Sequence, residues 1–576
     1  MLDESWRKPW TTTALLVACG VLAGCAPKTD VSATGNVPAQ YSHVFMSVQE
    51  IWFNTSSTAT PDDTTWLKFP LDTPVTVDLS AALEGTVSSL TTGLAVPIGT
   101  YQQVRLIPVD SGATLISSAQ TLGALYNFEA DYVDSTNTSR EVPLELQNPD
   151  KGIGIQTSVE VKGQGTNIFA SSSATSTSTT DTTTTPTTTS TSTTATPFSL
   201  AINVDGAKDL VPFVYPISSG NVAGMLLNPH VTAYDTSTVG AIQGTLSISG
   251  LSNITSASTG SYVDIQVTAE TLSTDGSRHI AVNSTPVRSD GTFTLYPLST
   301  STATQTSYDL VIHGPAIATI VIKSVPVSVG SPSTTTPVSV GTITPRASSS
   351  FLVNLSTTTP LQAGALVGFY QTLPGSTEVP YAIELPPIDP FNRNFPSDVS
   401  IAVGSNLDTG TFSSSGSDVA LSTVTPAEGA STYRVAATAP LFTDGPLTTL
   451  VTAPGSANTT TLIAVPALTV ATGSVSNTTT FTVAQTTAKK YDKGFVIVSH
   501  DGAIVATAAL DSVLAGSGTG SLAIAGIPAG LASSVYYVSV RTWNSTNSST
   551  PLNRETYPQA LNLSNSSIAT YSLQVD

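Results

Sequence analysis

The sequence has 576 residues, of which only 10 % are charged, and its 39 acidic against 20 basic side chains give a formal net charge of −19 at pH 7. An acidic chain without a basic cluster excludes nucleic-acid binding by phosphate neutralisation, and its sign disfavours charge-driven docking on anionic lipid. The length corresponds to about three to five domains, and the abundance of Thr, Ser, Val, Gly and Pro predicts all-β modules.

The chain begins with a pattern typical of a bacterial lipoprotein signal. A cationic pair, Arg7 and Lys8, precedes an apolar run over residues 14–23 that is too short to cross a bilayer as a stable helix. The run ends in the lipobox LAGC at residues 22–25, which predicts a signal peptide over residues 1–24 and a diacylglycerol on the Cys25 thiol. The alternatives are an ordinary signal that contains a cysteine and a poor transmembrane helix.

The two cysteines limit the redox chemistry that is possible and indicate where the protein is located. Cys19 lies inside the expected signal, so after cleavage Cys25 has no disulfide partner and a thiolate metal site is excluded. Attachment to the membrane would then come from acyl chains on Cys25. We therefore expect a cell-envelope lipoprotein, and Ala26 after the acylated cysteine favours the outer membrane if the organism is Gram-negative.

Residues 25–40 carry no periodicity and are interpreted as a tether to a first domain over residues 41–236. A short Ala/Leu/Ser segment at 80–92 is expected to be the only helix of this domain. A Gly-Thr-Tyr turn is expected to place Tyr101 against the sheet. Alternation of apolar and polar residues predicts strands at 41–53, 66–69, 75–79 and 102–109.

Five segments of this first domain share an order with a known family: VTVDL (75–79), VPIGTYQQVRLIPV (96–109), GIGIQ (152–156), SLAINVDGAKDLV (199–211) and MLLNPHVTAY (225–234). Together they resemble the bacterial lipoprotein family called domain of unknown function 4382, over about residues 35–236. The sequence departs from that family's pattern at Asn203-Val204-Asp205 and at Asn228-Pro229-His230. The resemblance implies a β-sandwich-like envelope domain and no assigned chemistry.

A Thr/Ser-rich tract at residues 171–197 interrupts these segments. It has no apolar residue larger than alanine, so it cannot bury a core and is interpreted as a disordered insertion in a loop. A long surface insertion costs little free energy because the entropy of loop closure grows only logarithmically with length. O-glycosylation of the tract is the alternative to a plain solvated loop.

Three further modules are expected after residue 238. The strands of 239–345, with the Asp290-Gly291 turn and the Phe-x-Leu strand after it, are similar to the carboxypeptidase-regulatory-like β-sandwich. Residues 473–576 resemble a transthyretin-like sandwich in the same order of strands. Residues 346–472 also alternate between Pro and Gly breaks, which predicts another sandwich. We expect the four modules to be strung away from the membrane, with the family-like domain nearest the lipid.

Catalytic and metal motifs are missing from the sequence. None of the five histidines lies in a recognisable motif, and His-Glu-x-x-His, Gly-x-Ser-x-Gly and Walker sequences are absent. Asp62-Asp63 lacks calcium-loop spacing. His500-Asp501-Gly502 is interpreted as a turn between two strands, and Asp78 and Asp205 as structural carboxylates. We therefore predict no enzyme, no cofactor and no metal site.

A tryptophan supplies the only candidate ligand site. Trp52 and Trp66 lie on expected neighbouring strands, where core burial is favoured, whereas Trp543 precedes a polar loop and is expected to be the more exposed. The favoured hypothesis is a non-enzymatic structural or interaction protein, bound to the membrane through Cys25 and to an unknown envelope protein or glycan. The alternatives are a glycan-binding lipoprotein that stacks sugar on Trp543 or on loop tyrosines, and an enzyme whose site comes from distant residues.

Overall fold

The computed structural model shows an all-β chain, as the sequence predicts. It describes residues 28–82, 85–133, 138–162, 198–217, 220–247, 265–300, 306–314, 317–330, 336–356, 365–384, 399–403, 406–430, 432–439, 441–443, 445–447, 451–452, 461–464, 468–470, 475–485, 491–516, 518–529, 535–547, 552–563 and 570–575. Within these ranges, no helix has the length and apolar character needed to cross a bilayer. The expected signal peptide, Cys25 and the Thr/Ser-rich tract lie outside the described residues.

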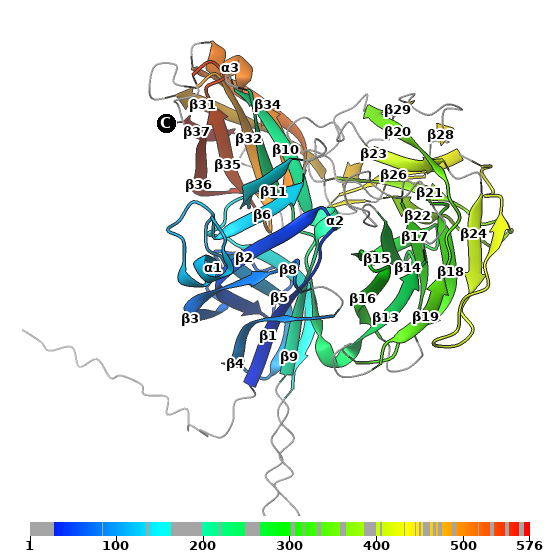
Figure 1. Cartoon of the computed structure of the whole chain (residues 1–576). Coiled ribbons are helices and arrows are strands. Elements are labelled where there is room, and N and C mark those ends of the chain that lie inside the picture. Colours follow the sequence, from blue (N-terminus) through cyan, green and yellow to red (C-terminus); the bar gives the residue numbers. More distant parts are fainter. Residues whose placement is uncertain are drawn as a thin grey trace, which may run out of the picture.

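The first module, residues 28–235, packs two sheets face to face around one apolar core (Figure 1). The smaller sheet has the order β12 (Thr232–Asp235), β9 (Phe198–Asp205), β1 (Lys28–Asn36), β4 (Ser88–Ala95). The larger sheet has the order β10 (Leu210–Ile217), β11 (Gly220–Leu227), β7 (Ser139–Glu145), β6 (Phe128–Val133), β2 (Tyr41–Asn54), β5 (Gly99–Pro108), β8 (Ile153–Val161), and β3 (Leu67–Asp78) pairs with β2. Two short helices are α1 (Ser117–Leu122) and α2 (Gly206–Asp209).

Two expectations for this module are wrong. The segment interpreted as a tether contains β1, an inner strand that pairs in parallel with β9 and antiparallel with β4. Its inward residues, Val31 and Ala33, are fully buried, but they are small and give a weak periodic signal. The segment expected to be helical ends in β4 instead, where Leu90 enters the core.

The second module places two sheets against each other after the short 3-10 helix η1 (Thr236–Thr238). One has the order β16 (Thr292–Ser299), β13 (Val239–Leu246), β19 (Val338–Ile343). The other has the order β15 (His279–Pro286), β14 (Gln266–Leu272), β17 (Ser307–His313), β18 (Ile320–Pro326), β24 (Leu407–Thr411), β25 (Ser422–Val424). The Asp290-Gly291 turn forms, with Gly291 at a φ of 87°, but it joins strands of different sheets and closes no hairpin.

The predicted boundary at residue 346 does not fully separate the second module from the third. Strands β24 and β25 come from the segment assigned to the third module, yet β24 pairs in parallel with β18 and extends the sheet of the second module. Pairing with β24 satisfies the backbone groups of β18, which otherwise forms the sheet edge. The Arg346 guanidinium contacts Asp408 at 3.1 Å, and the Arg346 carbonyl accepts from the Ala318 amide of the second module at 2.8 Å.

The third module has three small sheets. Their orders are β23 (Val399–Val403), β20 (Ser349–Ser356), β29 (Thr461–Ala464); then β22 (Tyr381–Glu384), β21 (Leu366–Gln371), β26 (Thr432–Thr438), β28 (Val451–Thr452); and β27 (Phe442–Thr443) with β30 (Thr469–Val470). Its buried residues belong to the same apolar cluster as those of the fourth module, from Val367 and Phe369 to Phe481 and Val538.

The fourth module is a sandwich of two sheets with one short helix, α3 (Asp511–Ala515). The sheets have the orders β34 (Thr519–Ala529), β31 (Val475–Gln485), β37 (Thr570–Val575) and β33 (Ala503–Ala509), β32 (Lys493–His500), β35 (Val535–Trp543), β36 (Asn553–Asn562). The module lies directly beside the first module, with β10 and β11 next to β32 (Figure 1), and side chains of β10 and β33 share one apolar cluster.

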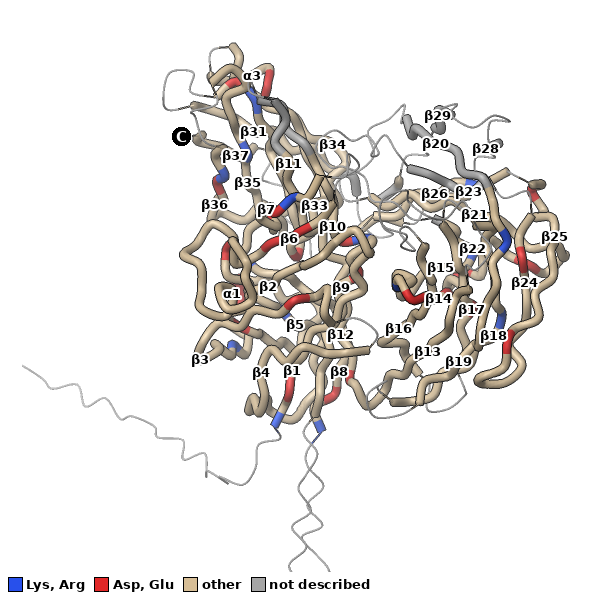
Figure 2. The backbone as a smooth tube through the Cα atoms, in the orientation of Figure 1, with Lys and Arg blue, Asp and Glu red and all other residues tan. Residues whose placement is uncertain are grey.

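The modules are therefore not strung out in a line. A cluster of apolar side chains from the first and fourth modules is shared between them: Val211, Phe213, Leu226, Ile497 and Ile504. The C-terminal module thus packs against the first module. Acidic and basic residues are sparse and scattered along the described part of the backbone (Figure 2).

Candidate functional site

The charged and polar groups that the sequence offers for chemistry gather at three junctions between modules. We call them the first–fourth, first–second and second–third junctions, after the modules that they join. Among the described residues, no group of three or more His, Cys, Asp or Glu side chains is arranged to hold a metal ion.

The first–fourth junction is built around the turn between β32 and β33. Asp501 and Gly502 occupy this two-residue turn with φ angles of 53° and 90°, conformations that an Asp-Gly pair tolerates. The turn inserts against β5 and β8 of the first module. There the Arg105 guanidinium, whose side chain is fully buried, contacts the Asp501 carboxylate at 2.5 Å. The Gly154 amide donates to the Asp501 carbonyl at 3.0 Å.

Glycine is required where this turn approaches the first module. A Cβ at Gly154 would lie 2.4 Å from the Asp501 carboxyl carbon, closer than any real contact. Burial alone would raise the pKa of Asp501, but the neighbouring His500 and Arg105 outweigh it and hold that pKa below its usual value. Arg105 also donates to the Lys151 carbonyl at 2.8 Å. The contact is therefore an ionised, largely desolvated pair between residues from β5 and the β32–β33 turn.

A second carboxylate, from a loop of the first module, reaches the fourth module nearby. Asp62 accepts a hydrogen bond from the Tyr537 hydroxyl at 2.9 Å and contacts the Lys151 ammonium at 2.6 Å. Partial burial opposes ionisation of Asp62, but these two partners lower its pKa, and burial beside that carboxylate raises the pKa of Tyr537. Asp62 thus holds two modules together, in place of the calcium role weighed for Asp62-Asp63.

A cavity of about 290 Å³ lies at the same junction. Glu145, at the end of β7, is buried and contacts the guanidinium groups of Arg541 on β35 and Arg554 on β36. Burial and the neighbouring Arg554 lower the pKa of Arg541. Amides at the rim bridge the modules, since Ser539 donates to Gln147 at 2.8 Å and Asn148 donates to Ser499 at 2.9 Å.

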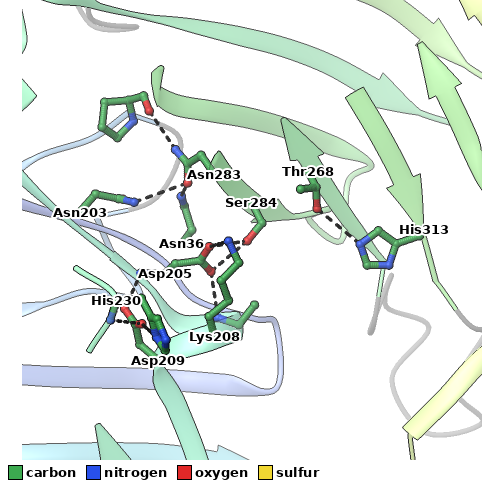
Figure 3. A network of polar contacts seen from close by, with 12 residues as sticks. Asn36, Asn203, Asp205, Lys208, Asp209, His230, Thr268, Asn283, Ser284 and His313 are labelled. Atoms are coloured by element: carbon green, nitrogen blue, oxygen red, sulfur yellow. Dashed lines mark hydrogen bonds and ion pairs between the residues drawn. The ribbon is translucent and has the colours of Figure 1, made fainter. Parts of the chain in front are cut away.

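The first–second junction carries the network in Figure 3. Asp205 caps helix α2 by accepting from the Ala207 amide, and it also accepts from the Ser284 hydroxyl of β15 at 2.8 Å. The Lys208 ammonium lies 3.1 Å from the same carboxylate. The Asn36 amide donates to the Asn283 side chain at 2.6 Å. The structural role expected for Asp205 is confirmed, and it extends to a contact between modules.

A buried acid, Asp209, contacts this network through the backbone of Asp205. Asp209 accepts from the backbone amide of His230 at 2.7 Å and from that of Asp205 at 3.0 Å. Burial raises the pKa of Asp209, against the opposing effect of His230. Asp209 and His230 thus fix the end of β9 and the residues after β11 in one arrangement. This is a structural use for a histidine that the sequence leaves without a motif.

The second–third junction contains a buried acid whose pKa is raised. Glu270 on β14 is buried and accepts from the Ala382 amide of β22 at 3.2 Å, and burial raises its pKa well above the usual value. Beside it, Asp309 accepts from the Tyr381 hydroxyl at 2.7 Å. The His279 ring lies on that of Tyr381, 3.9 Å between centroids, and burial lowers the pKa of His279. The cluster joins two modules and has little access to solvent.

The other predicted residues have mixed outcomes. Asp78 accepts from the Val44 and Ser80 amides at 3.2 and 3.0 Å and contacts the ring of His43, as expected of a structural carboxylate. Trp52 and Trp66 are buried together, as predicted, with ring centroids 5.9 Å apart.

The expected exposure of Trp543 is wrong. This side chain is only 5 % exposed, and its ring packs against Phe495 with centroids 5.9 Å apart. The physical reason is its place at the end of β35, an inner strand that pairs with both β32 and β36. In this position the ring contributes to the fourth module and presents no open face to a sugar.

Sequence reasoning missed the residues of the first–fourth junction. Arg105 lies within the segment that carries the family resemblance, but nothing in that segment indicates a partner 396 residues away. Glu145, Arg541 and Arg554 lie in ordinary alternating strands. Arg105 lies between the core residues Val104 and Leu106, so its side chain points away from the core of its own module, as a solvent-exposed arginine would, and only the packing of the fourth module buries it.

The fold and these junctions define a multi-module all-β protein whose polar clusters join its modules. Residues 30–208 match the family described as "Domain of unknown function (DUF4382)", which confirms the resemblance for most of the first module. The carboxypeptidase-regulatory-like and transthyretin-like resemblances stay predictions. A search of curated proteins returns no match.

Three solved structures show a distant likeness. The Bacillus anthracis TIE protein matches at 8 % identity and a TM-score of 0.13, over 95 % of this chain and 72 % of that chain. A tetra-tandem repeat from the extending region of a large adhesion protein matches at 10 % and 0.10, over 93 % and 100 %. A variant of BcpA, the major pilin subunit of Bacillus cereus, matches at 11 % and 0.12, over 96 % and 99 %.

Proposed function

We propose that this chain is a non-enzymatic protein of the bacterial cell envelope, anchored by lipid on Cys25, with a structural or interaction role. The observation that supports a structural role is the use of its charged groups. Asp62, Asp205, Asp309 and Asp501 each bind a residue of another module. Groups held in this way position β-sandwiches relative to one another and are not directed at a substrate.

The anchor is supported by the sequence before the first strand. The lipobox ends at Cys25, and β1 begins at Lys28, so only two residues separate an acylated cysteine from folded structure. The first module would then lie close to the bilayer, and the other modules would be held on it through the junctions. An outer-membrane location follows from Ala26 if the organism is Gram-negative.

The anchor is tested by acylation and fractionation in a bacterial host. We expect the wild-type protein to incorporate labelled palmitate, to begin at an acylated Cys25 by mass spectrometry, and to require detergent for extraction. Cys25→Ala should remove both the label and the membrane association. Cys19→Ala, a matched change inside the expected signal, should keep both. A wild-type protein that carries no acyl chain and is extracted without detergent would contradict the proposal.

Glycan binding through Trp543 remains the alternative, but the burial of that ring disfavours it. A glycan array separates the two functions. Binding by the wild-type protein that is lost in Trp543→Ala, with the fold retained by circular dichroism, would favour the glycan-binding lipoprotein.

A further inference from the structure

One end of the first module carries an exposed apolar residue at the place where the chain leaves the fold toward the expected anchor at Cys25. We call this end the exit face and define it by Lys28, Ala95, Ile98 and Lys162. Lys28 is the register partner of Ala95, which brings the start of β1 to the end of β4. Gly99 is the register partner of Val161, which brings the start of β5 to the end of β8. Strands β1, β4 and β9 lie together at this lower end of the module (Figure 1).

Ile98 is presented outward by its neighbours. Its side chain is 66 % exposed, the largest value among the exposed large apolar residues of the described chain. Val96, two residues earlier, is fully buried, and the Tyr101 hydroxyl donates to the Pro97 carbonyl at 2.7 Å. Val96 and Tyr101 therefore hold the turn on both sides of Ile98, which is fixed outside the core and does not belong to a freely moving loop.

The charges of the exit face differ from those of the whole chain. Lys28 is exposed, and the Lys162 side chain is 73 % exposed, with its ammonium 3.4 Å from Glu160. The other nearby acid, Asp30, accepts a hydrogen bond from the Gly93 amide at 2.8 Å. The face is thus close to neutral in a chain whose net charge is −19, so it does not share the repulsion that an anionic bilayer exerts on the rest of the protein.

The distance from the expected anchor restricts what can cover this face. Three residue steps separate Cys25 from Lys28, and an extended chain spans at most about 3.6 Å per step, so their Cα atoms lie within about 11 Å of each other. The polar region on each side of a bilayer is about 5–8 Å thick. A lipid on Cys25 therefore brings the exit face to the headgroups.

We infer that the exit face docks on the phospholipid bilayer, with Ile98 inserted between the headgroups and Lys28 and Lys162 at the level of the lipid phosphates. The inference rests on the proposed lipid anchor and adds an orientation to it. The first module would stand on the membrane on its exit face. The fourth module, at the opposite end of the first in Figure 1, would be held away from the membrane.

The test places one fluorescent probe on this face. The chain has two cysteines, Cys19 in the expected signal and Cys25, so Ile98→Cys leaves a single free thiol in the mature lipidated protein. This thiol is labelled with a nitrobenzoxadiazole probe, and the protein is reconstituted in vesicles of phosphatidylethanolamine and phosphatidylglycerol with or without brominated acyl chains. Leu272→Cys is the matched control, since this leucine of the second module is also exposed, at 55 %.

We expect bromolipid quenching at position 98 to be at least threefold greater than at position 272, with a blue-shifted emission at position 98 only. Flotation of the labelled proteins with the vesicles reports the anchor independently. Proteins that float but show equal quenching at both positions would overturn the docking and leave the anchor intact. Proteins that do not float would overturn the anchor and the docking together. Intrinsic tryptophan fluorescence verifies that both variants are folded.

Discussion

Neutralising Asp501 tests how much the contact between Arg105 and Asp501 at the first–fourth junction contributes to the free energy of unfolding. The Asp501→Asn substitution keeps the size of the side chain, and asparagine tolerates the positive φ of the turn. It leaves the Arg105 guanidinium, fully buried, without its counter-charge. Removing one partner from a buried charge pair is costly, but asparagine still offers an acceptor, so we expect a loss of about 2–3 kcal/mol in the free energy of unfolding.

Urea denaturation followed by tryptophan fluorescence measures this loss. The Arg105 guanidinium carbon lies over the Trp66 ring, 5.4 Å from the ring centroid, so Trp66 reports on the first module. For a urea dependence of about 2–3 kcal/mol per molar, the midpoint should fall by about 1 M. Asp290→Asn is the matched control, because Asp290 also precedes a glycine in a tight turn and its carboxylate accepts from Thr292, two residues away in the same module. Its midpoint should stay close to that of the wild-type protein.

A double-mutant cycle isolates the pair. Arg105→Met combined with Asp501→Asn should destabilise less than the sum of the single changes, with a coupling of about 1–3 kcal/mol. Because the pKa of Asp501 is lowered in the fold, its contribution is present above the ordinary value of 3.8 and is lost as the pH falls through the lowered pKa. Equal midpoints for the two asparagine variants at pH 7, or a coupling below about 0.5 kcal/mol, would refute the reasoning.

Three further variants test other parts of the structure. Ser284→Ala removes a hydroxyl that donates to a carboxylate of the first module, so thermal unfolding should show a loss of about 1–2 kcal/mol, whereas the exposed Ser277→Ala should show little change. Gly224→Ala places a Cβ 2.2 Å from the Phe213 ring at the first–fourth junction, and the overpacking should cost about 1–3 kcal/mol in urea denaturation. Burial and the neighbouring Glu129 raise the pKa of Asp131 to about 7, so the folded state binds the extra proton and stability falls as the pH rises from about 4 to 7. Asp131→Asn should therefore raise the melting temperature at pH 8 but not at pH 4, and an equal effect at both values would contradict the assignment.

The closed arrangement changes what the chain can display. In a linear string, each module is exposed on all sides and moves independently. Here the fourth module covers part of the first, and β24 and β25 of the third segment complete a sheet of the second. The surfaces buried in this way are therefore not open to a partner, as they would be in a linear string.

Local patterns in the sequence were sufficient for the fold class and for many elements. The alternation over residues 41–53 predicts β2, and the Asp-Gly chemistry at residues 501–502 predicts the turn between β32 and β33. The joint burial of Trp52 and Trp66 follows from their neighbouring strands. Each of these features depends on residues close together in the chain, where side-chain periodicity and backbone preference act directly.

Only the tertiary structure decided how the modules meet and what their polar residues do. The same Asp501 that the sequence marks as a turn residue becomes the counter-charge of Arg105, and Glu145 becomes the partner of Arg541 and Arg554. Such pairs join residues hundreds of positions apart, and the local pattern of neither segment indicates which residue will be its partner. Burial then requires this pairing, because a charged group removed from water destabilises the fold unless an opposite charge lies beside it.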